Sequence, residues 1–264
     1  MAGSAVVTIG YVDLGTRPTR VRSSASARLH EVSSIGEITV DSAAATFRTS
    51  RLQRIVCSTG TLVVRESVFA RDPAASLDQL SLSNCQATIA RNRFENQFGA
   101  LEATGGQVLV ENNLFVALDG FTDNARVLGS AGSLVRFNTF VNTTATPSDG
   151  AALCFDASVT VTSNIFAYRS MHPLGSVMTS CTGRAKFSVF DTSAIASEVV
   201  GEGNQQLNDA AFFVDRAARD FRLGSTSPAR EASEPGLPVD EDLAGNPRPS
   251  PIGTVPDVGA LEAP

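Results

Sequence analysis

The feature that most constrains this chain is a polar residue that recurs two positions before a phenylalanine. The six phenylalanines lie 25, 21, 25, 26 and 24 residues apart. A period of this length indicates a repeat architecture, in which each repeat is one structural unit that stacks on its neighbours. The pairs are Asn92/Phe94, Asn113/Phe115, Asn138/Phe140 and Asn164/Phe166, with Ser67/Phe69 and Ser188/Phe190 as weaker copies.

Apolar and polar residues alternate ahead of each phenylalanine, as in a strand with one buried face. The position five residues before it is apolar in all six repeats, and the position four residues before it is mostly polar. A second apolar column stands twelve positions before the phenylalanine and holds Cys57, Leu82, Ala103, Leu128, Cys154 and Met178. No repeat contains a convincing amphipathic helix, which disfavours a β–α solenoid. The pattern predicts an all-β parallel β-helix, a β-solenoid of roughly six to eight coils.

The repeated asparagines are predicted to form a structural ladder at a corner of each coil. A corner leaves backbone N–H and C=O groups unpaired, and an inward asparagine side chain can bond them. Its amide can also bond the asparagines of the coils above and below, as in other stacked strands. The predicted ladder residues are Asn92, Asn113, Asn138 and Asn164. The alternative is that these residues bind a ligand, which their regular period and inward position disfavour.

The repeat pattern divides the chain into three parts. Residues 1–35 are an N-terminal segment or an irregular first coil, and residues 36–192 are the β-helix coils. Residues 193–264 contain 8 of the 12 prolines and are predicted to form an irregular tail that packs on the β-helix or caps it. A cap is expected because the end of a solenoid exposes an apolar core and unpaired strand edges.

The tail is expected to cover an apolar stripe. Counting by twos from the second apolar column places Val127, Leu153, Phe155 and Val177 on the outside of the coils. Soluble monomers rarely leave a large contiguous apolar patch exposed. The tail offers matching apolar groups in Phe212, Phe213, Val214, Phe221 and Leu223. The alternative is that the stripe is an interface for another subunit or a ligand.

The four cysteines predict two disulfides that cross-link adjacent coils. Cys57–Cys85 and Cys154–Cys181, with spacings of 28 and 27 residues, are favoured among the three possible connectivities. Such bridges need an oxidising compartment. The alternative is four buried thiols, which are common in protein cores. No metal site is expected, because no C-x-x-C motif occurs and neither histidine has suitable ligand spacing.

Three segments near the C-terminus resemble the closing segment of choice-of-anchor Q proteins. They are DFRLGSTSPAREAS (220–233), DLAGNPRP (242–249) and DVGALE (257–262). The coils resemble the right-handed parallel β-helix superfamily, which includes pectate-lyase-like enzymes and many non-catalytic surface proteins. The resemblance implies a right-handed coil and a secreted or cell-surface bacterial protein, often followed by a sorting tail. It implies no particular activity.

Net charge and hydropathy argue against two kinds of partner, nucleic acid and the membrane interior. The net charge is −6 and there is no basic run, so nucleic acid is not an expected partner. No apolar run reaches the roughly 18 residues of a membrane span. The start, MAGSAVVTIG, lacks the features of a signal peptide, which is consistent with a mature form or with an added start methionine. Polysaccharide or a cell-surface protein remains as the expected partner.

The outward strand face shows little that predicts catalysis. A β-helix lyase needs a base, with positive charge, often calcium, on the sugar carboxylate. The face that carries such sites holds one basic residue, Arg54, and one carboxylate, Glu102, with no calcium cluster. Lys186, the sole lysine, is interpreted as a solvated side chain. The catalytic residues are therefore unknown, and no cofactor is expected unless the protein is a calcium-dependent lyase.

Loop residues supply the candidate binding site. Asp119, Asp123, Asp149, Arg169 and His172 follow the phenylalanine in three successive coils, so their loops are expected to share one edge. Loops on a rigid scaffold carry function disproportionately, although aspartate is also common in turns for structural reasons. We expect a non-catalytic extracellular or cell-surface module with a structural, carbohydrate-binding or partner-binding role. The alternative is a polysaccharide lyase or glycoside hydrolase that acts on an acidic polysaccharide.

Overall fold

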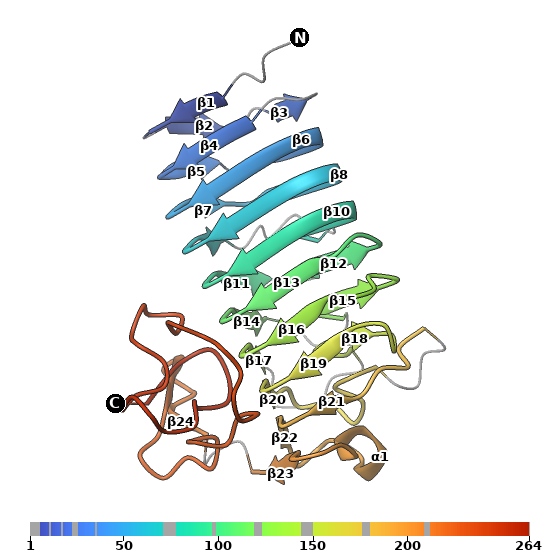
Figure 1. The fold of residues 1–264 in the computed structure, drawn as a ribbon, viewed down its shortest axis with the longest axis vertical. Helices are drawn as coiled ribbons and strands as arrows, with labels where there is room; N and C mark the ends of the chain where they lie inside the picture. Colours follow the sequence, from blue (N-terminus) through green and yellow to red (C-terminus); the bar gives the residue numbers. More distant parts are fainter. Residues whose placement is uncertain are drawn as a thin grey trace.

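Parallel strands stacked in about seven turns form a β-solenoid with almost no helix. The computed structural model describes residues 6–10, 12–16, 18–22, 26–34, 36–70, 78–96, 99–118, 123–143, 150–175, 180–208 and 212–263. The predicted fold class is thereby confirmed, while the right-handed sense of the coil stays an expectation from the resemblance. Figure 1 shows the coils stacked along the long axis, with the C-terminal tail beside the later coils.

The first sheet has 13 strands and carries the longer strand segments of each coil. In the early coils one long strand bends at a single residue, whereas in later coils the same path is split into two strands by a corner. Its strands are β1 (Val6–Ile9), β3 (Thr19–Arg22), β4 (Ser26–His30), β6 (Glu37–Arg48), β8 (Arg54–Arg65), β10 (Leu80–Ala90), β12 (Leu101–Thr104), β13 (Val108–Glu111), β15 (Ala125–Leu128), β16 (Leu134–Arg136), β18 (Cys154–Phe155), β19 (Thr160–Thr162) and β21 (Ala185–Lys186).

The second sheet has 10 strands and contains the repeated phenylalanines. Its strands are β2 (Val12–Gly15), β5 (Val32–Ser34), β7 (Arg51–Leu52), β9 (Val68–Phe69), β11 (Arg93–Asn96), β14 (Leu114–Ala117), β17 (Thr139–Asn142), β20 (Ile165–Ala167), β22 (Val189–Asp191) and β23 (Gln205–Leu207). A short helix, α1 (Ala196–Val199), precedes β23, and the tail contains the antiparallel pair β24 (Phe213–Asp215) and β25 (Asp220–Leu223). Parallel pairing therefore extends on both sides of residues 36–192, and the proposed domain division stays a prediction.

The corner before each repeated phenylalanine is held by a polar ladder. Nδ2 of Asn92 donates to Oδ1 of Asn113 at 3.0 Å, and the same step joins Asn113 to Asn138 and Asn138 to Asn164. Each amide also donates to a backbone carbonyl, as Asn92 does to Val64 O at 2.9 Å. Serines extend the ladder at its N-terminal end, and Ser188 and Asn204 extend it at the other. These side chains therefore link the corners of successive coils by hydrogen bonds.

The residue before each ladder position has a left-handed backbone, which bends the chain from one sheet to the next. Examples are Arg91 with φ 56° and Phe137 with φ 53°. This conformation is uncommon outside glycine and needs surrounding interactions to hold it. The ladder supplies them, because its oxygens accept the backbone N–H of the equivalent residue one coil earlier.

The repeated phenylalanines form a continuous stack inside the solenoid. Phe69, Phe94, Phe115, Phe140, Phe166 and Phe190 lie with ring centroids 4.5 to 5.3 Å apart and nearly parallel planes. All six are fully buried. Both predicted disulfides are present, Cys57–Cys85 and Cys154–Cys181, and each links neighbouring coils of the core.

The expected outward stripe is wrong. Val127, Leu153 and Phe155 are fully buried and belong to the main core, whereas Leu128 is partly exposed. The register pairs Ala103 with Val127, and Val127 with Phe155. Val177 and Met178, also assigned from this count, lie outside the described residues.

For Val127 the error has a simple physical origin at one corner. Four residues separate Thr104 from Leu109, whereas five separate their register partners, Leu128 and Leu134. An extra residue reverses the inward and outward sides of every position counted across the corner, because side chains in a strand alternate with period two. A count that assumes corners of constant length therefore assigns the wrong face.

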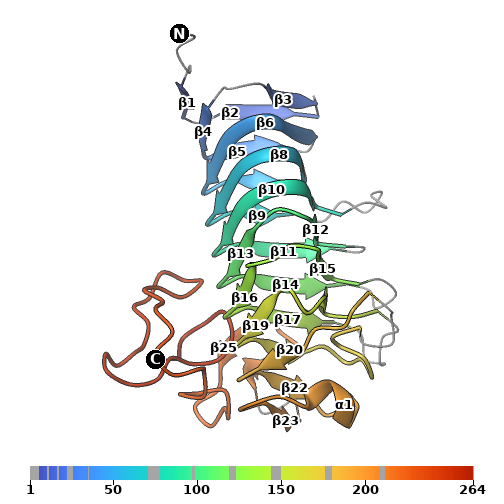
Figure 2. The ribbon, with the colours of Figure 1, turned by 45° about the vertical axis from the view of Figure 1, so that its right-hand side comes forward.

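The tail does pack on the solenoid, but against the outer face of the second sheet. That face presents Leu114, Val116, Val141, Ile165, Ala167 and Val189, and the tail covers them with Phe212, Phe213, Phe221, Leu223, Ala229, Val258 and Ala263. Figure 2 shows the tail beside the later coils and clear of the early ones. Phe213 contacts the rings of Phe212 and Phe221 edge-on.

Buried charged residues of the tail form a network that includes Arg248 of the DLAGNPRP segment and Glu262 of the DVGALE segment. Nε of Arg248 donates to Oε2 of Glu262 at 2.7 Å, and Nη1 donates to Oδ1 of Asn112 on the solenoid at 2.6 Å. The guanidinium carbon lies 4.7 Å from the ring centroid of Phe137. Burial lowers the pKa of Arg248, and the charge of Glu262 opposes this effect. Arg248 of the DLAGNPRP segment thus attaches the tail to the coils, and Glu262 of the DVGALE segment holds its guanidinium.

Candidate functional site

The outer face of the first sheet contains a shallow hollow of about 410 Å³ that spans successive coils. Its side-chain lining comes from β8, β10, β13 and β16 and the corners between them. The outward residues are Thr61, Gln86, Thr88, Gln107, Leu109 and Leu134. Hydroxyl and amide groups predominate among its polar atoms, and no charged residue lines it.

Strand register places these residues in rows that run along the solenoid axis. Thr88 pairs with Leu109, and Leu109 with Leu134, while Gln86 pairs with Thr61. Neighbouring strands in a sheet lie about 4.8 Å apart, so each row repeats its side chains at that spacing. One row therefore carries the polar side chains of Thr61 and Gln86, and the neighbouring row carries Thr88 followed by Leu109 and Leu134.

At the adjoining corner the chain passes so close to the backbone of the previous coil that glycine is needed. A Cβ atom on Gly106 would lie 2.2 Å from the carbonyl oxygen of Cys85, so the corner closes at that position only with glycine. Nε2 of Gln107 donates to the carbonyl oxygen of Gly132 at 3.0 Å on the next coil. This bond holds one wall of the hollow in place.

A row of basic residues lies on the first sheet in the early coils, outside the lining of the hollow. His30, Arg48 and Arg65 are register partners on β4, β6 and β8. Arg48 pairs with Glu66 at 2.9 Å, and Arg91 pairs with the same carboxylate. Burial would raise the pKa of Glu66, but hydrogen bonds and positive charge from these two arginines lower it below its usual value.

A pair of carboxyl groups lies on another part of the first sheet. Asp78, just before β10, hydrogen-bonds to Glu102 on β12, and burial together with the charge of Glu102 raises the pKa of Asp78 to about 6. Arg54 opposes that rise and forms an ion pair with Glu37 at 2.6 Å. The carboxylate of Asp78 fits because Gly99 has no side chain, since a Cβ there would lie 1.6 Å from Oδ1.

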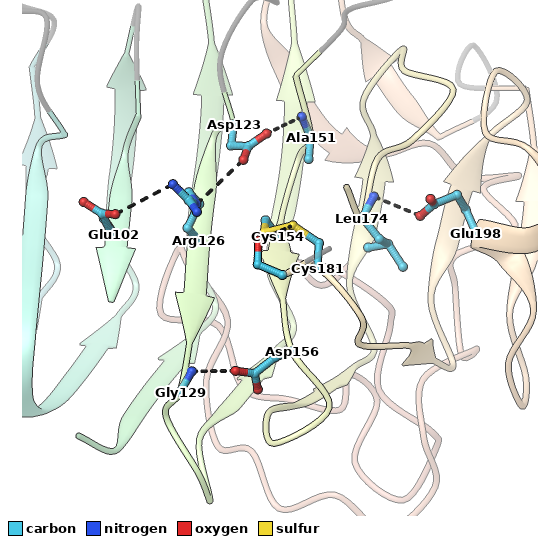
Figure 3. The surroundings of a disulfide bond; sticks show 11 residues. Glu102, Asp123, Arg126, Gly129, Ala151, Cys154, Asp156, Leu174, Cys181 and Glu198 are labelled. Carbon is cyan, nitrogen blue, oxygen red and sulfur yellow. Dashed lines mark hydrogen bonds and ion pairs between the residues drawn. A yellow bond between two sulfur atoms is a disulfide. The ribbon is translucent and has the colours of Figure 1, made fainter. Parts of the chain in front are cut away.

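The sequence prediction considered Arg54 and Glu102 and missed Asp78. Asp78 and Glu102 are 24 residues apart, about one repeat, which is the only sequence signal that could have joined them. On the following coil, Arg126 lies 3.9 Å from Glu102 and 3.9 Å from Asp123. Figure 3 shows the arginine between these two carboxylates. The carboxyl pair therefore forms part of a charged row.

The predicted binding-loop residues contact separate neighbours. Oδ1 of Asp123 accepts the backbone N–H of Ala151 at 2.9 Å, and the backbone N–H of Arg169 donates to Oδ1 of Asn142 at 3.1 Å. Nδ1 of His172 lies 3.3 Å from the buried carboxylate of Glu198. Asp119 and Asp149 lie outside the described residues. A common binding site for these five residues therefore stays a prediction.

Lys186 is not a free solvated side chain. It forms an ion pair with Glu234 of the tail, which also accepts a hydrogen bond from Thr162 at 2.8 Å. This lysine therefore helps to attach the tail to the solenoid.

Two further searches concern only the described part of the chain. No cluster of three or more histidine, cysteine, aspartate or glutamate side chains there has the arrangement to hold a metal ion. No helix within it has the length and apolar character to cross a membrane.

Comparison with known proteins adds no family assignment. The chain matches no protein-family model, and no curated protein matches it in sequence. The β-solenoid fold is therefore shown by the structure, and the choice-of-anchor Q resemblance stays a prediction.

Proposed function

We propose that this protein is a non-catalytic extracellular or cell-surface module that binds an extended polysaccharide on the outer face of its first sheet. The observation that carries the proposal is the hollow lined by Thr61, Gln86, Thr88 and Gln107. Hydroxyl and amide groups recognise sugar hydroxyls by hydrogen bonding, and the apolar Leu109 and Leu134 suit the C–H faces of a sugar ring. Both kinds of group recur along one axis, as the groups of an extended glycan do.

The two disulfides support the proposed extracellular location. Two disulfides link neighbouring coils, and disulfides persist in oxidising surroundings such as the outside of the cell. Their presence is compatible with an extracellular protein.

A binding experiment tests the proposal. The intact protein is screened on a glycan array that includes neutral and acidic polysaccharides, and affinities for the ligands found are measured by calorimetry. Gln86→Ala combined with Thr88→Ala should weaken binding at least tenfold, since both side chains line the hollow. The matched control is Ser83→Ala, an exposed residue of the same strand outside the hollow. Binding that the double variant leaves unchanged, or no binding to any glycan, would refute the proposal.

The carboxyl pair favours glycoside hydrolysis as a second candidate function. A raised-pKa carboxyl group beside a carboxylate is the chemistry of general acid catalysis. Asp78 and Glu102 share a hydrogen bond, however, whereas the carboxyl groups of glycosidases are about 5 Å or more apart, to leave room for the sugar. For this reason we place hydrolysis second.

Product analysis distinguishes catalysis from binding. Acidic polysaccharides are incubated with the protein, and reducing ends and unsaturated products are measured, with and without calcium. Product formation that disappears in Glu102→Gln would favour the enzyme over the binding module. Unsaturated products would specifically indicate a lyase.

A further inference from the structure

A second hollow lies where the tail meets the solenoid, and we call it the seam cavity. It has a volume of about 250 Å³, below the roughly 300–1,000 Å³ of pockets that hold drug-sized ligands. The tail lines it with residues 239–241, and the solenoid lines it with Arg65, Ala90, Arg91, Glu111 and Asn112. It shares no lining residue with the hollow on the outer face of the first sheet. The seam cavity is therefore a separate site with room for a small molecule.

The cavity exists because one side chain is short in a row of long charged ones. The successive register partners in this row of the first sheet are Arg48, Arg65, Ala90, Glu111 and Arg136. Neighbouring strands lie about 4.8 Å apart, so the backbones at Arg65 and Glu111 are about 10 Å apart. Only the methyl group of Ala90 stands between them, and the space above it is the floor of the cavity.

The tail forms the opposite wall, and hydrogen bonds fix it against the solenoid. Nδ2 of Asn112 donates to the carbonyl oxygen of Glu241 at 2.8 Å, and the carboxylate of Glu241 pairs with Arg91. Nη1 of Arg248 donates to Oδ1 of the same asparagine at 2.6 Å. The cavity therefore has two walls from distant parts of the chain, held together at one corner.

Most of the charges around the cavity already have partners. Arg91 pairs with Glu66 as well as with Glu241. Glu111 pairs with Arg136 on the next coil. These ion pairs balance one another, so they leave little net charge to attract a ligand.

Two lining residues of opposite charge remain. Within the part of the chain that the structure describes, the side chains of Arg65 and Asp240 form no hydrogen bond or ion pair with each other or with another residue. Arg65 is partly buried and Asp240 is exposed. The seam cavity thus presents one guanidinium and one carboxylate that can bind a ligand.

A ligand with a single charge fits this lining poorly. An anion bound to Arg65 would share the small cavity with the carboxylates of Glu111 and Asp240. A cation bound to Asp240 would share it with two arginines. Like charges in close proximity disfavour binding, whereas a ligand that carries both charges finds an opposite charge for each.

We propose that the seam cavity binds a small zwitterion of the amino-acid type, with its carboxylate on Arg65 and its ammonium group on Asp240. A guanidinium binds a carboxylate through two parallel hydrogen bonds, and an ammonium group donates charge-assisted hydrogen bonds to a carboxylate. The ligand joins the tail to the solenoid, because Arg65 belongs to β8 and Asp240 belongs to the tail. This site is independent of the proposed polysaccharide surface, so either can fail without the other.

Ligand derivatives test the need for both charges. Each of the common free amino acids is titrated into the intact protein, and binding is measured by calorimetry and by saturation-transfer NMR. We expect at least one to bind. Its N-acetyl and C-amide derivatives, which each lack one charge, should bind at least tenfold more weakly. Failure of every amino acid to bind, or equal binding of a derivative, would overturn the proposal.

Charge-neutralising variants test the location. Arg65→Gln and Asp240→Asn should each weaken binding of that amino acid at least tenfold. The controls are Arg51→Gln and Glu231→Gln, which change exposed residues outside the cavity and should leave the affinity within twofold. An equal loss in the controls would show that the ligand does not bind at this cavity.

A space-filling variant and a proteolysis assay test the site without relying on charge. Ala90→Gln fills the floor of the cavity and changes no charge, so it should weaken binding at least tenfold in protein that denaturant unfolding shows to be folded. The bound amino acid should also slow proteolysis of the tail in the parent protein but not in Asp240→Asn. Unchanged binding by folded Ala90→Gln, or equal protection of the tail in Asp240→Asn, would overturn the proposal.

Discussion

The side-chain amide of Asn113 donates to Oδ1 of Asn138, 3.0 Å away on the next coil. The same Nδ2 donates to the carbonyl oxygens of Ile89 and Glu111, and Oδ1 of Asn113 accepts from both nitrogens of Asn92. One buried side chain thus satisfies polar groups on three coils. None of these groups reaches water. Losing one of these contacts would therefore leave a buried polar group without a hydrogen bond, which costs the full desolvation penalty of that group.

Replacing this asparagine should destabilise the whole solenoid. Asn113→Leu leaves the backbone N–H of Asn92 and the carbonyl of Ile89 without their partner. We expect a loss of about 2–4 kcal/mol in the free energy of unfolding, the range for one or two buried unsatisfied groups. Denaturant unfolding measures it. Gln86→Leu, at an exposed amide, is the control, and equal midpoints for the two variants would show that the ladder contributes little.

The disulfides should be present in protein isolated from an oxidising compartment. Mass spectrometry of unreduced digests should recover peptides joined through Cys57–Cys85 and Cys154–Cys181. Reduction should destabilise the fold by about 3–4 kcal/mol for a single loop of this size, according to the chain-entropy model. Four thiols open to alkylation in the unreduced, unfolded protein would contradict this expectation.

Breaking the buried ion pair should loosen the tail. Arg248→Met leaves the carboxylate of Glu262 buried without its cation, at a cost of about 3–5 kcal/mol. Protease susceptibility of residues 212–263 should rise before the coils unfold. Arg222→Met, which removes an exposed arginine of the same tail, is the control. Adding Glu262→Gln should recover part of the loss, because it removes the stranded charge.

Deleting the tail should expose the second sheet. Removal of residues 212–264 uncovers the outer face of the second sheet, which includes Leu114, Val116 and Val141. We expect aggregation or binding of a hydrophobic dye, because a contiguous apolar face would meet water. Threonine at these three positions in the deleted form should reduce dye binding. A truncated protein that stays soluble and binds no dye would show that the tail is not the required cover.

Acid should stabilise the site around Asp78. Its pKa is raised from 3.8 to about 6, so the folded state holds more protons than the unfolded chain between these values. Stability from this residue is therefore greatest below pH 3.8 and falls as pH rises towards 6. Since the side chain is partly exposed, we expect about 1 kcal/mol.

Unfolding measured across this pH range tests the assignment. Asp78→Asn should be more stable than the parent protein at pH 7 and should lose that advantage at pH 4. Asp220→Asn is the control, because Asp220 is hydrogen-bonded to Arg222, which lowers its pKa. A difference between Asp78→Asn and the parent that does not change with pH would count against a protonated Asp78.

The sequence determined the repeat, and through it the fold class, the asparagine ladder, the phenylalanine stack and the disulfide partners. The cysteines were paired by their matching spacings of 28 and 27 residues, whereas the asparagines and phenylalanines recur at fixed positions in successive coils, close to the phenylalanine from which the residues are counted. Local strand alternation and a short corner suffice to place them, since few residues separate Asn113 from Phe115 or Val110. Errors in corner length elsewhere do not reach them.

The tertiary structure decided which residues face outwards beyond the next corner, and which distant segments meet. One extra residue between Leu128 and Leu134 buries Val127 and leaves Leu128 partly exposed. The carboxyl pair of Asp78 and Glu102 exists because two coils stack, and the tail covers the second sheet because its apolar groups fit there. The alternation of apolar and polar residues in one strand specifies neither the length of the next corner nor the long-range contacts. Both were decided by how the coils stack and how the tail packs on them.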